Sequence, residues 1–190
     1  MAILTQLGVP GDQHAWTTLG FSVADQRVQI GQVCCVLSAE RSWGFDEIHA
    51  DATLLGIPTT VQPAFASTEH LCGVTRVDHV VYTVADLNTG ITALTAALGT
   101  PPRRRFHPRG TAGPEMAFYR VGEAFIEVVA AESTPALIGL ALWSDDLTAT
   151  VRAIKAAGGP ISDPKPAVQG GRIATVWRGH LGWGLAIMGR

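Results

Sequence analysis

The sequence is poor in charged residues and in cysteine. Only 16% of its 190 residues are charged, while 47% are hydrophobic; the usual charged share is about 25%. A disordered chain has the opposite balance, so this composition predicts a folded protein with an extensive buried core. The three cysteines, Cys34, Cys35 and Cys72, form no CxxC pair, which argues against a disulfide framework or a cysteine-rich zinc site. We expect them to be small buried hydrophobic residues.

The sequence also lacks a basic surplus and a long apolar run. Lys and Arg number 14 against 16 Asp and Glu, so the electrostatic footprint of a nucleic-acid-binding protein is missing. No apolar stretch approaches the roughly 20 residues of a membrane span, and nothing reads as a signal peptide. No GxSxG, P-loop or GxGxxG motif joins a strand to a helix. We therefore expect a cytoplasmic protein that binds neither nucleic acid nor membranes.

An internal repeat is the most informative feature that is present. Residues 79–99 and 139–158 both show a short apolar run, then Asp-Leu, then apolar residues at three- and four-residue spacing, and then glycine. This pattern predicts a strand, a helix with Asp86 or Asp146 at its N-cap, and a glycine stop. Each copy continues with strand-like runs and is interpreted as a βαβββ unit. The last two strands of each unit are predicted at 115–121 and 124–129, and at 172–178 and 183–188.

The N-terminal region is interpreted as a third, degenerate βαβββ-like unit followed by a linker. It offers a short helical stretch and several strand-like runs, including 21–23 and 45–49. The fold class is therefore predicted to be α+β, with tandem βαβββ units. The predicted organisation is a unit at 1–72, a unit at 73–132 and a unit at 133–190, the last two forming one domain at 73–190.

The first strand of the first clear unit reads His79-Val80-Val81-Tyr82-Thr83-Val84-Ala85-Asp86-Leu87. Tandem βαβββ units with this motif resemble the vicinal oxygen chelate superfamily, which includes glyoxalase I, bleomycin-resistance proteins and extradiol dioxygenases. The resemblance is clearest over residues 74–190. It implies that paired units curl a mixed β-sheet into a cup, with helices outside, around a divalent metal and a substrate.

The same resemblance implies two site residues. His79 matches the family's ligand position on the first strand, and Glu127 matches the position on the last strand. As a pair they are expected to bind Zn, Fe, Ni, Co or Mn, or to act as a metal-independent acid/base pair. In the second unit, Gly139 stands at the histidine position, and Ala186 or Ile187 stands at the glutamate position. The four-ligand set is therefore incomplete, and a two-ligand site is expected to bind metal weakly.

Further candidates for substrate binding are aromatic and basic. Aromatic side chains on predicted strands can stack on a planar ligand or serve as ordinary core residues. Arg103 and Arg105 share a face of a predicted strand and can bind a carboxylate or phosphate, or protect an exposed edge. His180, in a turn before the last strand, is considered as a ligand from the rim. The aromatic candidates are Tyr82, Phe118, Trp143 and Trp177.

Two functions follow from these features. The first is a small-molecule enzyme of the lyase, isomerase or oxygenase type, with His79 and Glu127 as metal ligands or acid/base pair. The alternative is a metal-free protein that binds or sequesters a small molecule, as bleomycin-resistance proteins do; a degenerate member with a structural role is a third, plainer interpretation. The low charge fraction and the strand edges predict a homodimer.

Overall fold

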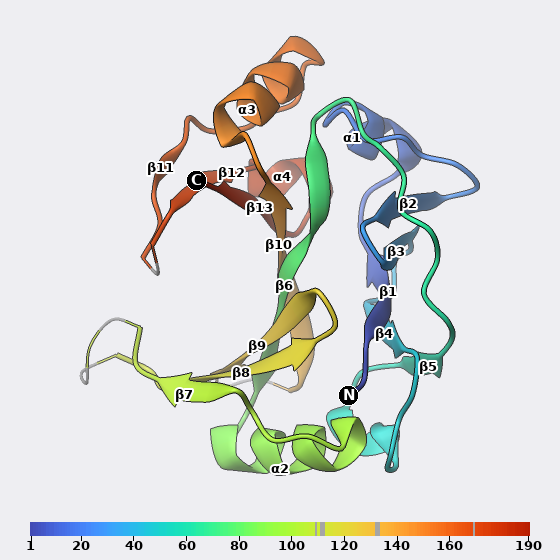
Figure 1. Ribbon diagram of the computed structural model, residues 1–190, viewed down its shortest axis with the longest axis vertical. Coiled ribbons are helices and arrows are strands. Elements are labelled where there is room, and N and C mark those ends of the chain that lie inside the picture. The colour runs from blue at the N-terminus through green and yellow to red at the C-terminus, as the bar shows by residue number, and fades with distance from the viewer. Residues whose placement is uncertain (109, 111–112, 132–133, 169) are drawn as a thin grey trace.

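The computed structural model describes residues 1–108, 110, 113–131, 134–168 and 170–190. Within these residues, no helix has the length and apolar character needed to cross a membrane. Figure 1 shows the helices and strands. In chain order they are β1 (Leu4–Val9), α1 (Gln13–Thr17), β2 (Arg27–Ile30), β3 (Val33–Leu37), β4 (Ser42–Phe45), η1 (Ala52–Leu55), β5 (Thr59–Val61), β6 (Val74–Val84), α2 (Leu87–Leu98), β7 (Arg104–Phe106), β8 (Met116–Val121), β9 (Ala124–Ala130), β10 (Ala136–Ser144), α3 (Leu147–Ala156), β11 (Lys165–Pro166), β12 (Arg172–Thr175), α4 (Arg178–Leu181) and β13 (Gly184–Gly189).

The two clear repeats build one eight-stranded sheet in the order β11-β12-β13-β10-β6-β9-β8-β7. Each first strand pairs in parallel with the last strand of its own unit, β6 with β9 and β10 with β13. The two units join where β6 and β10 pair antiparallel. In Figure 1 this sheet is curled, with α2 and α3 on its outside; we call its concave side the hollow. The predicted α+β cup of βαβββ units is confirmed.

The two long helices begin and end where the repeat predicts. The Asp86 carboxylate accepts a hydrogen bond from the backbone N–H of Thr89 at the start of α2, and the Asp146 carboxylate accepts one from Ala149 at the start of α3. Gly99 ends α2 in the left-handed conformation, with φ 67°. These local interactions satisfy orphan backbone groups and explain why the helix boundaries are readable from the sequence.

Residues 4–61 form a second sheet, in the order β2-β3-β1-β4-β5. Its strand relationships repeat those of the large sheet, since β1 is parallel to β3 and antiparallel to β4, while β4 is parallel to β5. Two local expectations are wrong. Residues 21–23 form no strand, and the run expected at 45–49 is instead β4, which ends at Phe45. The three cysteines are free and buried, as expected.

The small sheet covers the back of the large sheet, away from the hollow. Trp43 of β4 is fully buried, and its ring centroid lies 4.9 Å from that of Tyr82 on β6. The Tyr82 hydroxyl donates a 2.7 Å hydrogen bond to the backbone oxygen of Leu55. Burial raises the pKa of Tyr82 to about 12, so this donor keeps its proton at neutral pH. The N-terminal region therefore closes the core behind β6 and leaves the cup open.

His70 is a buried part of the same N-terminal layer. Its side chain is 8% exposed, and its ring contacts Phe21 with centroids 5.1 Å apart. The backbone N–H of Ser22 donates to Nδ1, and Nε2 contacts the backbone oxygen of Gln29 at 2.8 Å. Since a carbonyl only accepts, Nε2 carries the proton and the ring is neutral. Burial lowers the pKa of His70.

We expect His70 to make the folded state sensitive to acid. Its folded-state pKa lies below the unfolded value of about 6.5, so the neutral ring contributes stability above that pH, and this stability is lost as the pH falls through the folded pKa. In His70→Gln, the free energy of unfolding measured by denaturant titration should depend less steeply on pH between about 7 and about 5. His14→Gln, at an exposed position of α1, should keep the wild-type slope; an unchanged slope in His70→Gln would contradict the assignment.

Candidate functional site

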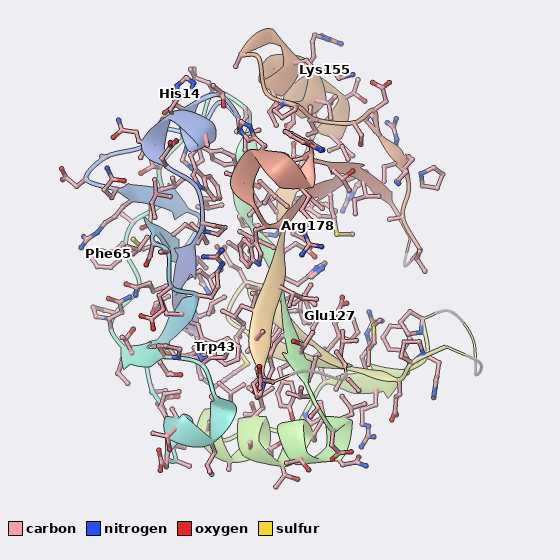
Figure 2. The ribbon with its side chains drawn as sticks, turned by 180° about the vertical axis from the view of Figure 1, so that it is seen from behind. His14, Trp43, Phe65, Glu127, Lys155 and Arg178 are labelled. Carbon is pink, nitrogen blue, oxygen red and sulfur yellow. The ribbon has the colours of Figure 1, made fainter. Side chains whose placement is uncertain are left out.

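The hollow of the large sheet holds a cavity of about 630 Å³. This volume lies in the usual range of roughly 300–1,000 Å³ for small-molecule sites. Figure 2 places Glu127 on the cup and Trp43 in the N-terminal layer behind it. All residues that line the cavity belong to the two clear βαβββ units.

Strand register explains which side chains of the first unit reach the cavity. Phe125 and Glu127, two residues apart on β9, face the same side of the sheet, and both line the cavity. Phe125 pairs with His79 on β6, and Glu127 pairs with Phe118 on β8. The register thus brings His79, Phe118 and Glu127 to the lining of one cavity.

Asp78 enters the cavity through a β-bulge. Along β10, the consecutive residues Ala141 and Leu142 pair with His79 and Val77, so Asp78 is an extra residue in β6. Strict alternation would turn Asp78 and His79 to opposite faces, but a bulge changes the direction of the inserted side chain. Both residues line the cavity. Sequence reasoning placed no function on Asp78, because a bulge leaves no signal in a single strand.

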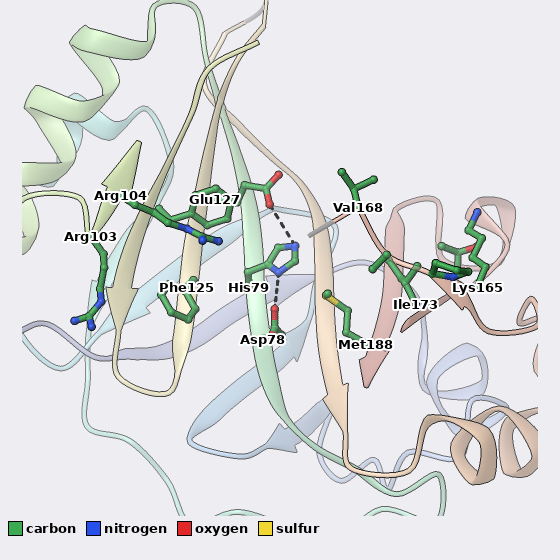
Figure 3. Close-up of a pocket in the computed structure, with 14 residues that line it drawn as sticks. Asp78, His79, Arg103, Arg104, Phe125, Glu127, Lys165, Val168, Ile173 and Met188 are labelled. Carbon is green, nitrogen blue, oxygen red and sulfur yellow. Dashed lines mark hydrogen bonds and ion pairs between the residues drawn. The ribbon is translucent and has the colours of Figure 1, made fainter. Parts of the chain in front are cut away.

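The bulge sets His79 between two carboxylates (Figure 3). The His79 Nδ1 atom lies 2.7 Å from Asp78 Oδ2, so Nδ1–H donates to this carboxylate. On the other side of the ring, Nε2 lies 3.6 Å from Glu127 Oε2. The side chains of Asp78, His79 and Glu127 are 24%, 18% and 13% exposed. Asp78 fixes the ring orientation, and it directs Nε2 toward Glu127 in a largely desolvated environment.

The second unit contributes no matching polar group. Gly139 pairs with Val81 across the junction of the two units, and Ala141 pairs with both His79 and Ala186. When the first unit is superposed on the second by these strand pairings, His79 corresponds to Gly139 and Glu127 corresponds to Ala186. Ala186, and not Ile187, therefore stands at the glutamate position of the second unit. Ile187 is fully buried on the opposite face. The half of the cup that would complete a symmetric site thus has almost no side-chain bulk at these positions.

The donor set does not fit a resident divalent metal. Within the part of the chain that the structure describes, no three or more His, Cys, Asp or Glu side chains are placed to hold one. His79 Nδ1 is engaged by Asp78, so only Nε2 and the Glu127 carboxylate remain as a pair. Catalytic and structural sites use about three or four protein ligands, and Gly139 and Ala186 cannot supply the others.

A cationic side chain lies on an aromatic platform at one rim. The Arg104 guanidinium carbon is 4.4 Å from the Phe106 ring centroid and 5.0 Å from that of Phe118. The two rings stack with centroids 5.4 Å apart. Arg103 and Arg104 line the cavity. Arg105 does not: it forms an ion pair with Glu115 at 2.7 Å, and its hydrogen bonds lower the pKa of that carboxyl.

The remaining predicted site residues lie outside the cavity lining. Tyr82 faces the N-terminal layer, and Trp143 donates its Nε1–H to Asp145 beneath Arg76. Trp177 is 68% exposed at the start of α4. The imidazole of His180 lies 2.9 Å from the backbone oxygen of Ala15, so it docks α4 on the N-terminal layer. The alternation that turns Glu127 to the cavity would also have found Phe125, whereas a bulge turns Asp78 inward and strand order brings in the residues of the second unit. The lining residues that were not predicted include Asp78, Phe125, Lys165, Val168, Ile173, Thr175 and Met188.

Comparisons with known proteins agree with this geometry. The model of the Glyoxalase/Bleomycin resistance protein/Dioxygenase superfamily matches residues 76–187. A methylmalonyl-CoA epimerase from Mycobacterium tuberculosis is similar in structure, with a TM-score of 0.52 and 22% identity over 62% of this chain and 89% of that chain. Hypothetical protein BH1468 from Bacillus halodurans C-125 has a TM-score of 0.52 and 15% identity, covering 60% of this chain and 94% of that chain.

A third similar structure is a variant of the Streptomyces coelicolor methylmalonyl-CoA epimerase in complex with 2-nitronate-propionyl-CoA. Its TM-score is 0.51, with 15% identity over 61% of this chain and 94% of that chain. No curated protein matches. At these identities the structural similarity concerns the fold, and the chemistry must be argued from the residues of this chain.

Proposed function

Because the chain belongs to the glyoxalase/bleomycin resistance protein/dioxygenase superfamily, we propose that its cup binds a small molecule and catalyses proton transfer at a carbon next to a carbonyl group. This is an isomerase-type reaction. The observation that carries the proposal is the row Asp78–His79–Glu127, in which an imidazole stands between two carboxylates inside a cavity.

In the proposed reaction, Glu127 is the general base. Its carboxylate takes the proton as the C–H bond breaks, and the electron pair moves to the carbonyl oxygen. Phe118 and Phe125 line the cavity beside Glu127, and the Glu127 side chain itself is little exposed. Both features reduce the screening of charges by water. The isomerised product forms when Glu127 returns the proton to the neighbouring carbon, or to the opposite face of the same carbon after the bound intermediate has turned. Either return regenerates the carboxylate.

His79 is proposed to act on the developing oxyanion. With Nδ1–H held by Asp78, a protonated ring presents Nε2–H to the carbonyl oxygen, and Asp78 balances the charge of the imidazolium. A donor that is already oriented toward developing charge is a large source of catalysis. His79 on β6 and Glu127 on β9 are held by two paired strands in the middle of the sheet, which fix their relative position.

A metal-free binding protein is the second candidate. The missing donors at Gly139 and Ala186, and the apolar residues Ile173 and Met188 of the second unit, favour a site that only holds a ligand. Such a protein would bind small molecules in the cup without changing them. The two functions differ in whether a bound compound loses a C–H proton to solvent.

We expect the protein to exchange the acidic C–H hydrogen of a substrate with deuterium. Small carbonyl compounds, including methylmalonyl-CoA, are incubated with the protein in heavy water, and loss of the C–H signal is followed by nuclear magnetic resonance. Exchange should require the protein and should persist after dialysis against a chelator, since the donor set does not fit a resident metal. Binding without exchange would favour the sequestering protein instead, and exchange abolished by the chelator would overturn the metal-independent mechanism.

The homodimer and the cytoplasmic location stay predictions. The N-terminal sheet covers the back of β6, where Trp43 meets Tyr82. A dimer that left this layer in place would therefore need another surface, such as the edge strands β7 and β11 of the large sheet or β2 and β5 of the small one.

A further inference from the structure

The two walls of the cup differ in polarity, and we propose that the cup selects a small carboxylate that carries an apolar group. The carboxylate would lie at Arg104 and the apolar group against Ile173 and Met188, with the reacting carbon between them, next to Glu127. This inference rests on the proposed function and names its substrate class.

Arg104 is oriented for recognition of a carboxylate. Its guanidinium stacks over Phe106 and Phe118, so its face is occupied by the rings. The five N–H donors of a guanidinium lie in its plane, and their fork geometry matches a carboxylate. In Figure 3 the side chain extends toward His79 and Glu127, which are labelled with it. A carboxylate bound here would lie near the acid/base pair.

The floor of the cup restricts where a negative group can bind. Asp78 and Glu127 flank His79 on both sides. Like charges in a poorly screened cavity repel each other. An anionic ligand is therefore directed away from the floor and toward the rim that carries Arg103 and Arg104.

The opposite wall suits an apolar group. Ile173 of β12 pairs with Met188 of β13, and both line the cavity together with Val168. Between this wall and His79 the strands carry the small residues Ala141 and Ala186. Among the described residues, Lys165 is the one cation that lines this wall, and it is exposed. Figure 3 shows Lys165 farther from His79 than Ile173 is.

A matched pair of probes tests this class. Phenylacetate and phenylacetamide share one ring and nearly one shape, but only phenylacetate carries a charge. Titration calorimetry on the full chain should show the acid binding about 10- to 100-fold more tightly than the amide, as expected for hydrogen bonds to a charged group. Arg104→Gln should remove most of this preference. Lys165→Gln removes an equal charge at the far wall and should change the preference less than about threefold.

The apolar wall has its own variant. Ile173→Ala should lower the affinity for phenylacetate and for phenylacetamide by a similar factor of about ten or more. Both probes lose the same apolar contact, and each methylene contributes about fourfold in affinity. Equal affinity for acid and amide in the wild type, a preference that survives Arg104→Gln, or binding of neither probe would overturn the proposal. Arg104 is exposed, and unchanged thermal unfolding of its variant would show that the fold is intact.

Glu127→Gln separates this proposal from the proposed reaction. This variant lacks the base but keeps Arg104 and the apolar wall, so its preference for the acid should remain. If the preference holds and no carbonyl compound exchanges deuterium in the wild type, the substrate class stands and the reaction fails. If exchange occurs equally with neutral and anionic compounds, the reaction stands and the class fails.

Discussion

Glu127→Gln should lower the rate of deuterium exchange by about 100-fold or more. The amide has nearly the shape of the carboxylate but cannot take a proton, and general base catalysis typically contributes about 10²–10⁴-fold. The free energy of unfolding should change by less than about 1 kcal/mol, because the residue faces the cavity and not the core. Exchange rate and denaturant stability are measured on the same preparation.

Glu115→Gln is the matched control for this change. Glu115 precedes β8 and forms an ion pair with Arg105 outside the cavity lining. Its exchange rate should therefore stay within about twofold of the wild type, since an exposed ion pair contributes about 0–1 kcal/mol and touches no ligand. A Glu127→Gln protein that exchanges as fast as this control would rule out Glu127 as the base.

Trp43→Ala should produce the largest loss of stability, about 3–5 kcal/mol in the free energy of unfolding. Trp43 is fully buried between the two sheets, where its ring contacts Phe45 and Tyr82. Its Nε1–H also donates a 2.8 Å hydrogen bond to Thr59. Since whole domains are stable by only about 5–15 kcal/mol, this change removes a large share.

Trp177→Ala provides the comparison with the same residue type. Trp177 is 68% exposed, so its replacement should change the free energy of unfolding by about 0.5 kcal/mol or less. Chemical denaturation followed by circular dichroism measures both variants. Equal losses in the two would mean that the N-terminal sheet does not share one core with the cup.

The helices and the repeat were predictable because their signals are local. Asp86 and Asp146 cap helices whose apolar residues recur at helical spacing, and these interactions span a few residues. The repeat of this pattern predicts paired βαβββ units, and the resemblance to the vicinal oxygen chelate superfamily implies His79 and Glu127 as site residues. The structure brings these two residues to the same cavity.

Register and twist were not predictable in the same way. Whether Ala186 or Ile187 matches Glu127 depends on which atoms of β10 and β13 pair. Arg103 and Arg105 were expected to share a face, yet β7 begins at Arg104, and Arg104 lies over Phe118 while Arg105 turns to Glu115. A shift of one residue moves a side chain to the other face of a sheet.

Local signals in the chain thus predict the βαβββ units and the helix boundaries, and the family resemblance adds His79 and Glu127. The packing of distant strands is what brings Asp78 beside these two residues, buries Tyr82 in the core and places residues 4–61 over the back of the sheet. The reason is physical: capping and helical periodicity arise between near neighbours in the chain. A bulge, a sheet face and a layer of packing depend on strands that are distant in sequence and meet only in the fold.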